Sequence, residues 1–302
     1  MAEPAAPATP ADRSPLAAFW AAFSENRGAV LGLTVLAVIV LLAVLANVVA
    51  PYSPNEQFRD AVRASPFWAD GGSSRFLLGT DSLGRDMLSR LIHGARISLF
   101  IGVAVMGVSF VLGVLLGLAC VASTGPLGTA VDVVVTRTMD LIMAVPGLVL
   151  AILVVAVLGP SLANTIVAVT IVALPRYVRL VRASALGELG KDYVVAARVA
   201  GVRLRRLLFV TVLPNCLSPL IVQAALGVSD AILEAAALGF LGLGAQPPTA
   251  EWGTMLADAR EFIRSNPWLV TMPGVAILVT VVSINLMGDG LRDALDPKMR
   301  RS

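Results

Sequence analysis

The chain has 302 residues, of which 57% are hydrophobic and only 14% are charged, and its formal net charge is +3. Soluble domains carry about 25% charged residues, so this composition excludes an ordinary soluble domain and predicts a protein embedded in lipid. The small positive excess is better explained by membrane topology than by nucleic-acid binding. The two cysteines, Cys120 and Cys216, lie in or beside apolar stretches and do not form a disulfide framework.

The first 28 residues are expected to lie outside the bilayer core. Residues 1–15 are rich in alanine and proline, which predicts a disordered tail. Ser14 followed by Pro15 is a typical helix start. Residues 16–28 are therefore predicted to form an interfacial helix, anchored by aromatic residues that share one side, namely Phe19, Trp20 and Phe23.

The first membrane span is predicted at residues 29–50, which are uncharged and long enough to cross a bilayer, a distance of roughly 20 helical residues. This run is longer than the apolar core of a signal peptide, so we expect it to be retained. Residues 51–96 are predicted to be a loop outside the bilayer. The end of this loop, Gly79 to Arg96, is predicted to be an amphipathic helix at the membrane surface, with a solvated polar face of Arg85, Asp86, Ser89, Arg90 and His93.

Residues 97–290 are predicted to form the core, with five further spans, followed by a charged tail at residues 291–302. The second, third, fifth and sixth spans are expected at residues 97–121, 141–158, 217–244 and 269–287, with a kink at Pro146-Gly147 in the third. Residues 162–174 are short for a fourth span unless that helix continues through Tyr177 to Val181.

A strongly basic stretch follows the fourth predicted span. Residues 175–212 contain eight arginines and lysines against Glu188 and Asp192, which predicts a polar loop on the cytoplasmic side. Counting six spans from this loop places both termini in the cytoplasm. The loops after the first and fifth spans then lie outside.

The sequence predicts no catalytic site and no metal site. Neither lysine, Lys191 or Lys298, ends the pattern of a Walker loop, so the chain is not expected to bind ATP phosphates in that way. A single histidine, His93, excludes a site with several histidine ligands. Motifs of serine hydrolases and zinc proteases are also absent from the sequence.

Four acids lie within or beside the predicted spans, where a bare carboxylate is costly: Asp132, Asp140, Asp230 and Glu234. The first two flank Arg137, so pairing or exposure at the bilayer boundary explains them. The last two lie four residues apart on one face of the fifth span. They either pack against a partner helix or line a translocation path, and both interpretations stay open.

Residues 192–215, DYVVAARVAGVRLRRLLFVTVLPN, resemble the EAA loop of permease subunits in binding-protein-dependent ABC importers. That pattern is Glu-Ala-Ala, three residues, Gly, nine residues, Ile, one residue and Leu-Pro. The matching residues are Ala196, Ala197, Gly201, Leu213 and Pro214, whereas Val195 and Thr211 replace the glutamate and the isoleucine.

Three further stretches, GTDSLGRDMLSRLIHGARIS, GFLGLGAQPPTAEWGTMLADAR and GLRDALDP, resemble the dipeptide, oligopeptide and nickel permease group. Within that group the chain is similar to the second permease subunit, which has an extra N-terminal span. The resemblance implies an all-α transmembrane domain of a type I ABC importer. It assigns ATPase coupling to an EAA-like loop at residues 183–214, with coupling residues Asp192, Ala196, Ala197, Arg198, Gly201, Leu213 and Pro214.

The residues of this loop suit a docking helix on physical grounds as well. Asp192 can cap a short helix and Gly201 can end it with a positive φ. Ala196 and Ala197 have little bulk, so the helix can seat in a groove of another protein. Pro214 is expected where the chain turns back towards the membrane.

The resemblance also implies partners. These are a homologous permease subunit, two ATPase subunits or domains that bind ATP and Mg, an extracytoplasmic substrate-binding protein and membrane lipid, in the plasma membrane of a prokaryote. No cofactor is expected in this chain, and no nucleic acid. Di- or oligopeptides are the first expectation for the substrate, with nickel, haem or another small ligand as the alternative. A more distant alternative is a secondary transporter driven by an ion gradient, with Asp230 and Glu234 as its only candidate ion sites, and a third is a receptor or scaffold without transport.

Overall fold

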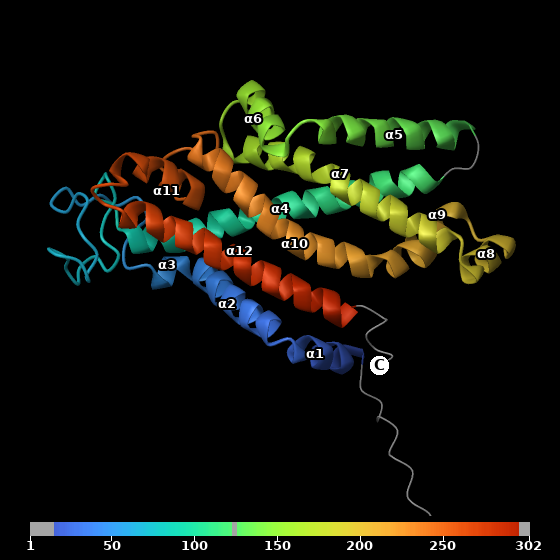
Figure 1. The fold of residues 1–302 in the computed structure, drawn as a ribbon, viewed down its shortest axis with the longest axis horizontal. Helices are drawn as coiled ribbons and strands as arrows, with labels where there is room; N and C mark the ends of the chain where they lie inside the picture. The colour runs from blue at the N-terminus through green and yellow to red at the C-terminus, as the bar shows by residue number, and fades with distance from the viewer. Residues whose placement is uncertain (1–14, 123–125, 296–302) are drawn as a thin grey trace, which may run out of the picture.

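The computed structural model describes residues 15–122 and 126–295, which form helices joined by turns and loops (Figure 1). The long helices are α2 Arg27–Val44, α4 Met87–Ala122, α5 Pro126–Ala144, α7 Leu162–Leu189, α10 Leu213–Phe240 and α12 Trp268–Leu295. The short helices are α1 Pro15–Glu25, α3 Ala46–Val49, α6 Gly147–Leu158, α8 Asp192–Val199, α9 Leu204–Arg206 and α11 Trp252–Ala259, with a π-helical segment at Leu207–Val212 and a 3-10 turn at Arg260–Phe262. The predicted disordered tail and the last residues of the chain lie outside the described residues, apart from Pro15.

Among the described residues, four helical runs are long and apolar enough to cross a membrane: Arg27–Val44, Met87–Ala122, Leu204–Phe240 and Trp268–Leu295. They contain most of the predicted first, second, fifth and sixth spans. The pair of α5 and α6 passes the same test together, but the two helices meet at a bend of 96°. The all-helical membrane fold is therefore confirmed, whereas the number of six spans stays a prediction.

The helix α4 is continuous over 36 residues, about 54 Å, and it includes residues 87–96 of the predicted surface helix and the whole of the predicted second span. It begins at Met87, and residues 79–86 form turns. The prediction of a solvated polar face is wrong, because the loop at residues 51–86 covers this part of the chain. The buried side chains are those of Arg85, Asp86, Ser89 and Arg90, and His93 is half-buried.

Ion pairs inside this loop compensate the buried charges. Arg85 Nε lies 2.6 Å from Asp81 Oδ2, and Arg90 Nε lies 3.4 Å from the same oxygen. Arg90, which is only 2% exposed, also donates from Nη1 to the Pro54 carbonyl at 3.2 Å. Arg85 Nη2 also lies 3.5 Å from Asp258 Oδ2 of α11, so the partners of these arginines come from the loop and from a distant helix, and the sequence around them does not reveal their burial.

Pro146 separates α5 from α6. Proline has no N–H to donate and disfavours helical geometry at the residue before it, so a break at this point follows from the sequence. The predicted position of the kink is confirmed, but the angle of 96° is far larger than a kink within one straight span. Gly147 allows α6 to lie close to α7, since a Cβ at this position would be 2.7 Å from Val172 Cγ1.

The helix α7 continues through Pro175 to Leu189. The predicted fourth span therefore extends past Val181. This is the extension that residues 162–174, which are too few to cross a bilayer, needed to form a span. The prediction of a polar loop beginning at residue 175 is wrong, because residues 175–189 are helical. The polar loop between α7 and the next long helix is consequently much shorter than predicted.

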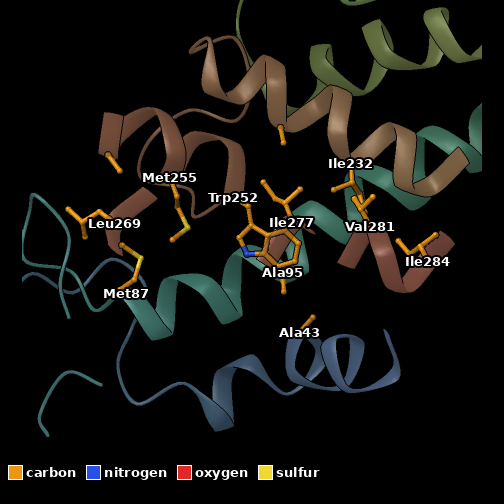
Figure 2. Close-up of a cluster of buried hydrophobic side chains, with 12 residues drawn as sticks. Ala43, Met87, Ala95, Ile232, Trp252, Met255, Leu269, Ile277, Val281 and Ile284 are labelled. Carbon is orange, nitrogen blue, oxygen red and sulfur yellow. The ribbon is translucent and has the colours of Figure 1, made fainter. Parts of the chain in front are cut away.

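A cluster of buried hydrophobic residues joins α2, α4, α10, α11 and α12 (Figure 2). The indole of Trp252 lies inside this cluster next to Ala95, and its Nε1 donates to the Leu91 carbonyl at 3.0 Å. Gly94 leaves room for the indole, since a Cβ there would be 2.9 Å from Trp252 Cδ1. The cluster fixes the short helix α11 to the membrane helices.

The N-terminal helix α1 packs against the end of α12. Phe23 is buried there, and its ring stacks on Phe19 and Trp20 with centroid distances of 6.2 and 5.8 Å. The prediction that these three aromatic residues share one side is confirmed. Figure 1 shows α1 and the end of α12 side by side, away from the loop at residues 51–86.

Glu251 holds the start of α11 and was not identified from the sequence. Its carboxylate is 2% exposed and accepts hydrogen bonds from the N–H groups of Gly253 at 2.8 Å and Thr254 at 2.9 Å. The Ser98 hydroxyl donates to it at 3.3 Å, which links α11 to α4. The acid is therefore a buried N-cap that satisfies two otherwise unpaired donors.

Stability is expected to depend on the protonation of Glu251. Burial raises the pKa of this carboxyl group, while its three hydrogen bonds act in the opposite direction. A group whose folded-state pKa is raised stabilises the fold below its unfolded pKa, and this contribution is lost as pH rises through the folded pKa. The variant Glu251→Gln does not titrate. Melting temperatures of both proteins are measured by circular dichroism in detergent. We expect the wild type to gain stability relative to the variant as pH falls. A difference in melting temperature that does not change with pH would contradict this role of Glu251.

Candidate functional site: the coupling loop and the charged seam

The helices α8 and α9 protrude at the end of the molecule opposite to α11 and the loop at residues 51–86 (Figure 1). We call residues 190–206 the coupling loop. The helix α7 leads into it, and the π-helical segment Leu207–Val212 leads from it into α10. The loop is thus directly continuous with two long helices of the bundle.

The start of α8 differs from the prediction. Its N-cap residue is Lys191, whose side chain makes no capping hydrogen bond, and Asp192 is the first residue of the helix. The prediction that Asp192 caps α8 is therefore wrong. Its carboxylate still stabilises α8, because a negative charge in the first turn interacts favourably with the helix dipole. Glu188 joins the two helices, since its carboxylate pairs with Lys191 Nζ at 2.5 Å and accepts a hydrogen bond from the Tyr193 hydroxyl.

Gly201 ends α8 in the way that the sequence predicted. Its φ is +76°, a left-handed conformation that favours glycine. The Gly201 N–H donates to the Arg198 carbonyl at 3.0 Å and the Val202 N–H donates to the Ala197 carbonyl at 3.1 Å. This pair of bonds is a Schellman motif, which satisfies carbonyls at the helix end.

Replacing Gly201 with alanine is expected to loosen the end of α8. An L-residue in the left-handed conformation costs about 1–2 kcal/mol. Gly201→Asn is the matched control, because asparagine tolerates this conformation better. Hydrogen exchange of the α8 amides should be faster by about tenfold in the alanine variant, and less affected in the asparagine variant. Equal exchange in wild type and Gly201→Ala would contradict this role.

One side of α8 is buried in its own chain and the other is exposed. Val194 is fully buried in a cluster with Leu207 and Cys216, and Ala197 packs partly against this cluster. Ala196 is exposed, together with three apolar side chains whose exposure the sequence does not reveal: Val195, Val199 and Leu204. Val199 is the most exposed of them, at 83%.

Leu213 and Pro214 do not lie at a turn. The helical run Leu204–Phe240 is continuous, and Pro214 is in the first turn of α10 directly after the π-helical segment. The prediction that Pro214 marks a turn of the chain is wrong, because the helical run continues through it. The π-helical segment directly before Pro214 is where the missing proline N–H interrupts the α-helical hydrogen bonds. The last residues of the coupling loop, Leu204–Arg206, are therefore continuous with α10.

A row of ion pairs connects α7 with α5 and α10, and we call it the charged seam. Its three pairs are Arg176–Asp230 at 2.6 Å, Arg179–Asp140 at 2.5 Å and Arg182–Asp132 at 2.6 Å. The arginines follow at every third residue of α7, so they share one face of that helix. These arginines belong to the stretch that was predicted to be a basic loop. Their pairing is the main correction to that prediction.

Asp230 and Glu234 lie on one cleft between α7 and α10, together with Arg176, Tyr177 and Gln223. Asp230 is half-exposed even though it is paired with Arg176, and Glu234 is half-buried. Charges that remain open to one side in the middle of a membrane helix face either a water-filled path or another subunit. The structure brings both predicted acids to one place, and their role stays a prediction.

This architecture defines a class of protein: an all-helical membrane-embedded chain with a helical loop that protrudes at one end. The sequence matches the family of binding-protein-dependent transport system inner membrane components over residues 109–301. Residues 14–66 match the N-terminal transmembrane domain of oligopeptide transport permease C. The chain belongs to this family, and it is a permease subunit of an ABC importer.

Known relatives match nearly the whole chain. It is 56% identical to the di/tripeptide transport system permease protein DppC of Pseudomonas aeruginosa (strain UCBPP-PA14), over 96% of this chain and 94% of that protein. It is 54% identical to the dipeptide transport system permease protein DppC of Escherichia coli (strain K12), over 97% and 96% of the two chains. The expected resemblance to the second permease subunit of the peptide group is confirmed.

A solved structure shares the fold. A chain of the MetNI methionine ABC transporter in inward-facing conformations superposes with a TM-score of 0.57 and 20% sequence identity, covering 70% of this chain and 98% of that one. At this identity the likeness concerns the fold alone.

Proposed function

We propose that this chain and a homologous permease subunit form the path by which di- or oligopeptides enter a prokaryotic cell across its plasma membrane. The observation that carries the coupling part of this proposal is the exposed apolar surface of α8 on a loop that continues directly into α7 and α10. The peptide substrate is supported by the names of the relatives that match nearly the whole chain.

In this proposal the energy comes from two ATPase subunits or domains, which bind ATP and Mg outside this chain. Both termini and the coupling loop lie in the cytoplasm, and the loop at residues 51–86 faces an extracytoplasmic binding protein that delivers the substrate. The coupling loop is still basic although the three paired arginines lie in α7, and this is typical of a cytoplasmic loop. Its basic residues are Lys191, Arg198, Arg203, Arg205 and Arg206.

The coupling loop is built to transmit a displacement. The buried side of α8 is fixed to the bundle through Val194, and Glu188 links α7 to α8. A force on α8 therefore acts on α7 and α10 together. The Arg176–Asp230 pair joins these two helices halfway along α10, so a change in their relative position alters the cleft that holds Asp230 and Glu234.

Transport by the purified complex in vesicles tests the proposal. Uptake of radiolabelled di- and tripeptides should require the binding protein outside and ATP on the side of the ATPases. Dissipation of ion gradients with an ionophore should leave this uptake unchanged. Uptake that follows an ion gradient without ATP would favour the secondary transporter, and uptake of nickel or haem but not of peptides would overturn the substrate.

The acids of the cleft are proposed to line the path. A cysteine at position 230 should react with a water-soluble thiol reagent, and the rate should change by about tenfold or more when ATP and the binding protein are added. Ile221→Cys is the control, since Ile221 is exposed and lies nine residues before Asp230, on the opposite side of α10. A cysteine at position 230 that is unreactive in every state would show that a partner helix covers the acids instead.

A further inference from the structure

An apolar groove of about 430 Å³ lies on the outside of the bundle between α2, α4, α10 and α12. Both α2 and α10 pack on α4 and on α12, and the groove lies between these four helices. Its lining includes Leu36, Val40, Phe100, Val103, Val228 and Ile284. The volume falls within the range of pockets that bind small ligands.

One charged residue, Arg96 of α4, lines this groove. Its Nε donates to the Ala43 carbonyl and its Nη2 donates to the Val44 carbonyl, both at 3.0 Å. These carbonyls are at the end of α2, where no helical donor reaches them. No carboxylate within residues 15–122 and 126–295 pairs with Arg96, so its charge is not neutralised by the described chain.

The position of Arg96 gives the groove a direction. Val44 is the last residue of α2 before the loop at residues 51–86, so Arg96 lies towards that end of the membrane helices. From there the wall formed by α2 extends back to Leu36, which is about 12 Å along the helix. A positive charge near one membrane surface, with an apolar channel running deeper from it, matches the shape of a phospholipid.

We propose that this groove binds an anionic phospholipid from the leaflet next to the loop at residues 51–86, with its phosphate on Arg96 and an acyl chain along α2. Charge complementarity supports this occupant, because an arginine at the edge of the hydrocarbon needs an anion and a lipid phosphate provides one. A membrane-exposed basic residue of this kind also selects anionic over zwitterionic lipids. A helix from another subunit would have to supply its own acid to neutralise Arg96.

The test uses the purified transporter that contains this chain, incubated with equal amounts of phosphatidylglycerol and phosphatidylcholine carrying identical acyl chains. Native mass spectrometry counts the lipids that remain bound. Wild type should bind about five times more phosphatidylglycerol than phosphatidylcholine, because one basic residue near an anionic head group contributes about 1 kcal/mol. Arg96→Gln keeps a donor for the carbonyls of α2 but loses the charge, so the preference should fall to about one. Arg96→Lys should retain it.

Two further variants separate the groove from general effects. Val103→Trp fills the groove and leaves Arg96 in place, so it should release both lipids to a similar extent. Arg264→Gln removes an exposed arginine outside the groove and should change nothing. An unchanged lipid preference in Arg96→Gln, or unchanged binding in Val103→Trp, would overturn the proposal. So would a photoreactive residue at position 103 that cross-links to the second permease subunit rather than to lipid.

Discussion

Replacing Gly113 or Gly117 with leucine is expected to destabilise the folded chain by about 3 kcal/mol, the upper part of the range for overpacked cores. Both glycines are buried where α4 crosses α7. A Cβ at position 117 would lie 2.7 Å from Val181 Cβ, and one at position 113 would collide with Tyr177 Cβ. These atoms belong to the stems of the side chains and cannot move without the helix backbone. Small residues allow this close approach in lipid, where packing is the main force between helices.

The measurement is the melting temperature and the yield of monodisperse protein in detergent, with Gly107→Leu as the matched control. Gly107 is on the same helix, is exposed, and has no atom within 4 Å of a Cβ placed there. The control should behave as wild type, whereas both other variants should melt at clearly lower temperature. If Gly113→Leu and Gly107→Leu melt alike, α4 and α7 do not meet as described.

Replacing Val199 with aspartate is expected to uncouple the permease from its ATPases without harming its fold. Val199 is 83% exposed in the isolated chain, so a carboxylate is solvated there. In the proposed complex the same position is covered, and an unpaired buried charge costs about 3 kcal/mol, a roughly hundredfold loss of affinity. The readout is the amount of ATPase retained on purification, together with ATP hydrolysis stimulated by peptide-loaded binding protein.

Val62→Asp provides the control for this variant. Val62 is also an exposed valine, but it lies in the loop at the opposite end of the molecule. It should retain the ATPases as wild type does. Normal ATPase retention in Val199→Asp would show that this face of α8 is not the docking surface.

The sequence predicted those features of the fold that depend only on residues close together along the chain. Apolar runs located four of the helices that can cross a membrane, Pro146 located the break between α5 and α6, and Gly201 located the end of α8. Each of these follows from the length of an apolar run or from the backbone properties of one residue. The spacing of Ala196, Ala197, Gly201, Leu213 and Pro214 pointed to the family, although Val195 and Thr211 depart from the pattern.

Contacts between distant segments could not be read in the same way. Arg176, Arg179 and Arg182 look like loop residues in the sequence, because their partners Asp230, Asp140 and Asp132 lie 54, 39 and 50 residues away. The burial of Arg90 depends on Asp81 and on a carbonyl of the preceding loop. In both cases the sequence alone does not show which acid pairs with the arginine, because the two residues come close only in the folded chain.

Cross-linking from position 199 shows whether the exposed side of α8 docks on a separate ATPase, as proposed above. The two native cysteines are buried, so Val199→Cys introduces the accessible thiol that a bifunctional reagent needs. In the complete transporter this cysteine should cross-link to an ATPase subunit, with a yield that changes on ATP binding. A cysteine at position 62 should not form this product. Absence of any ATPase adduct from position 199, with the complex intact, would show that α8 is not the part of the chain that docks on the ATPase.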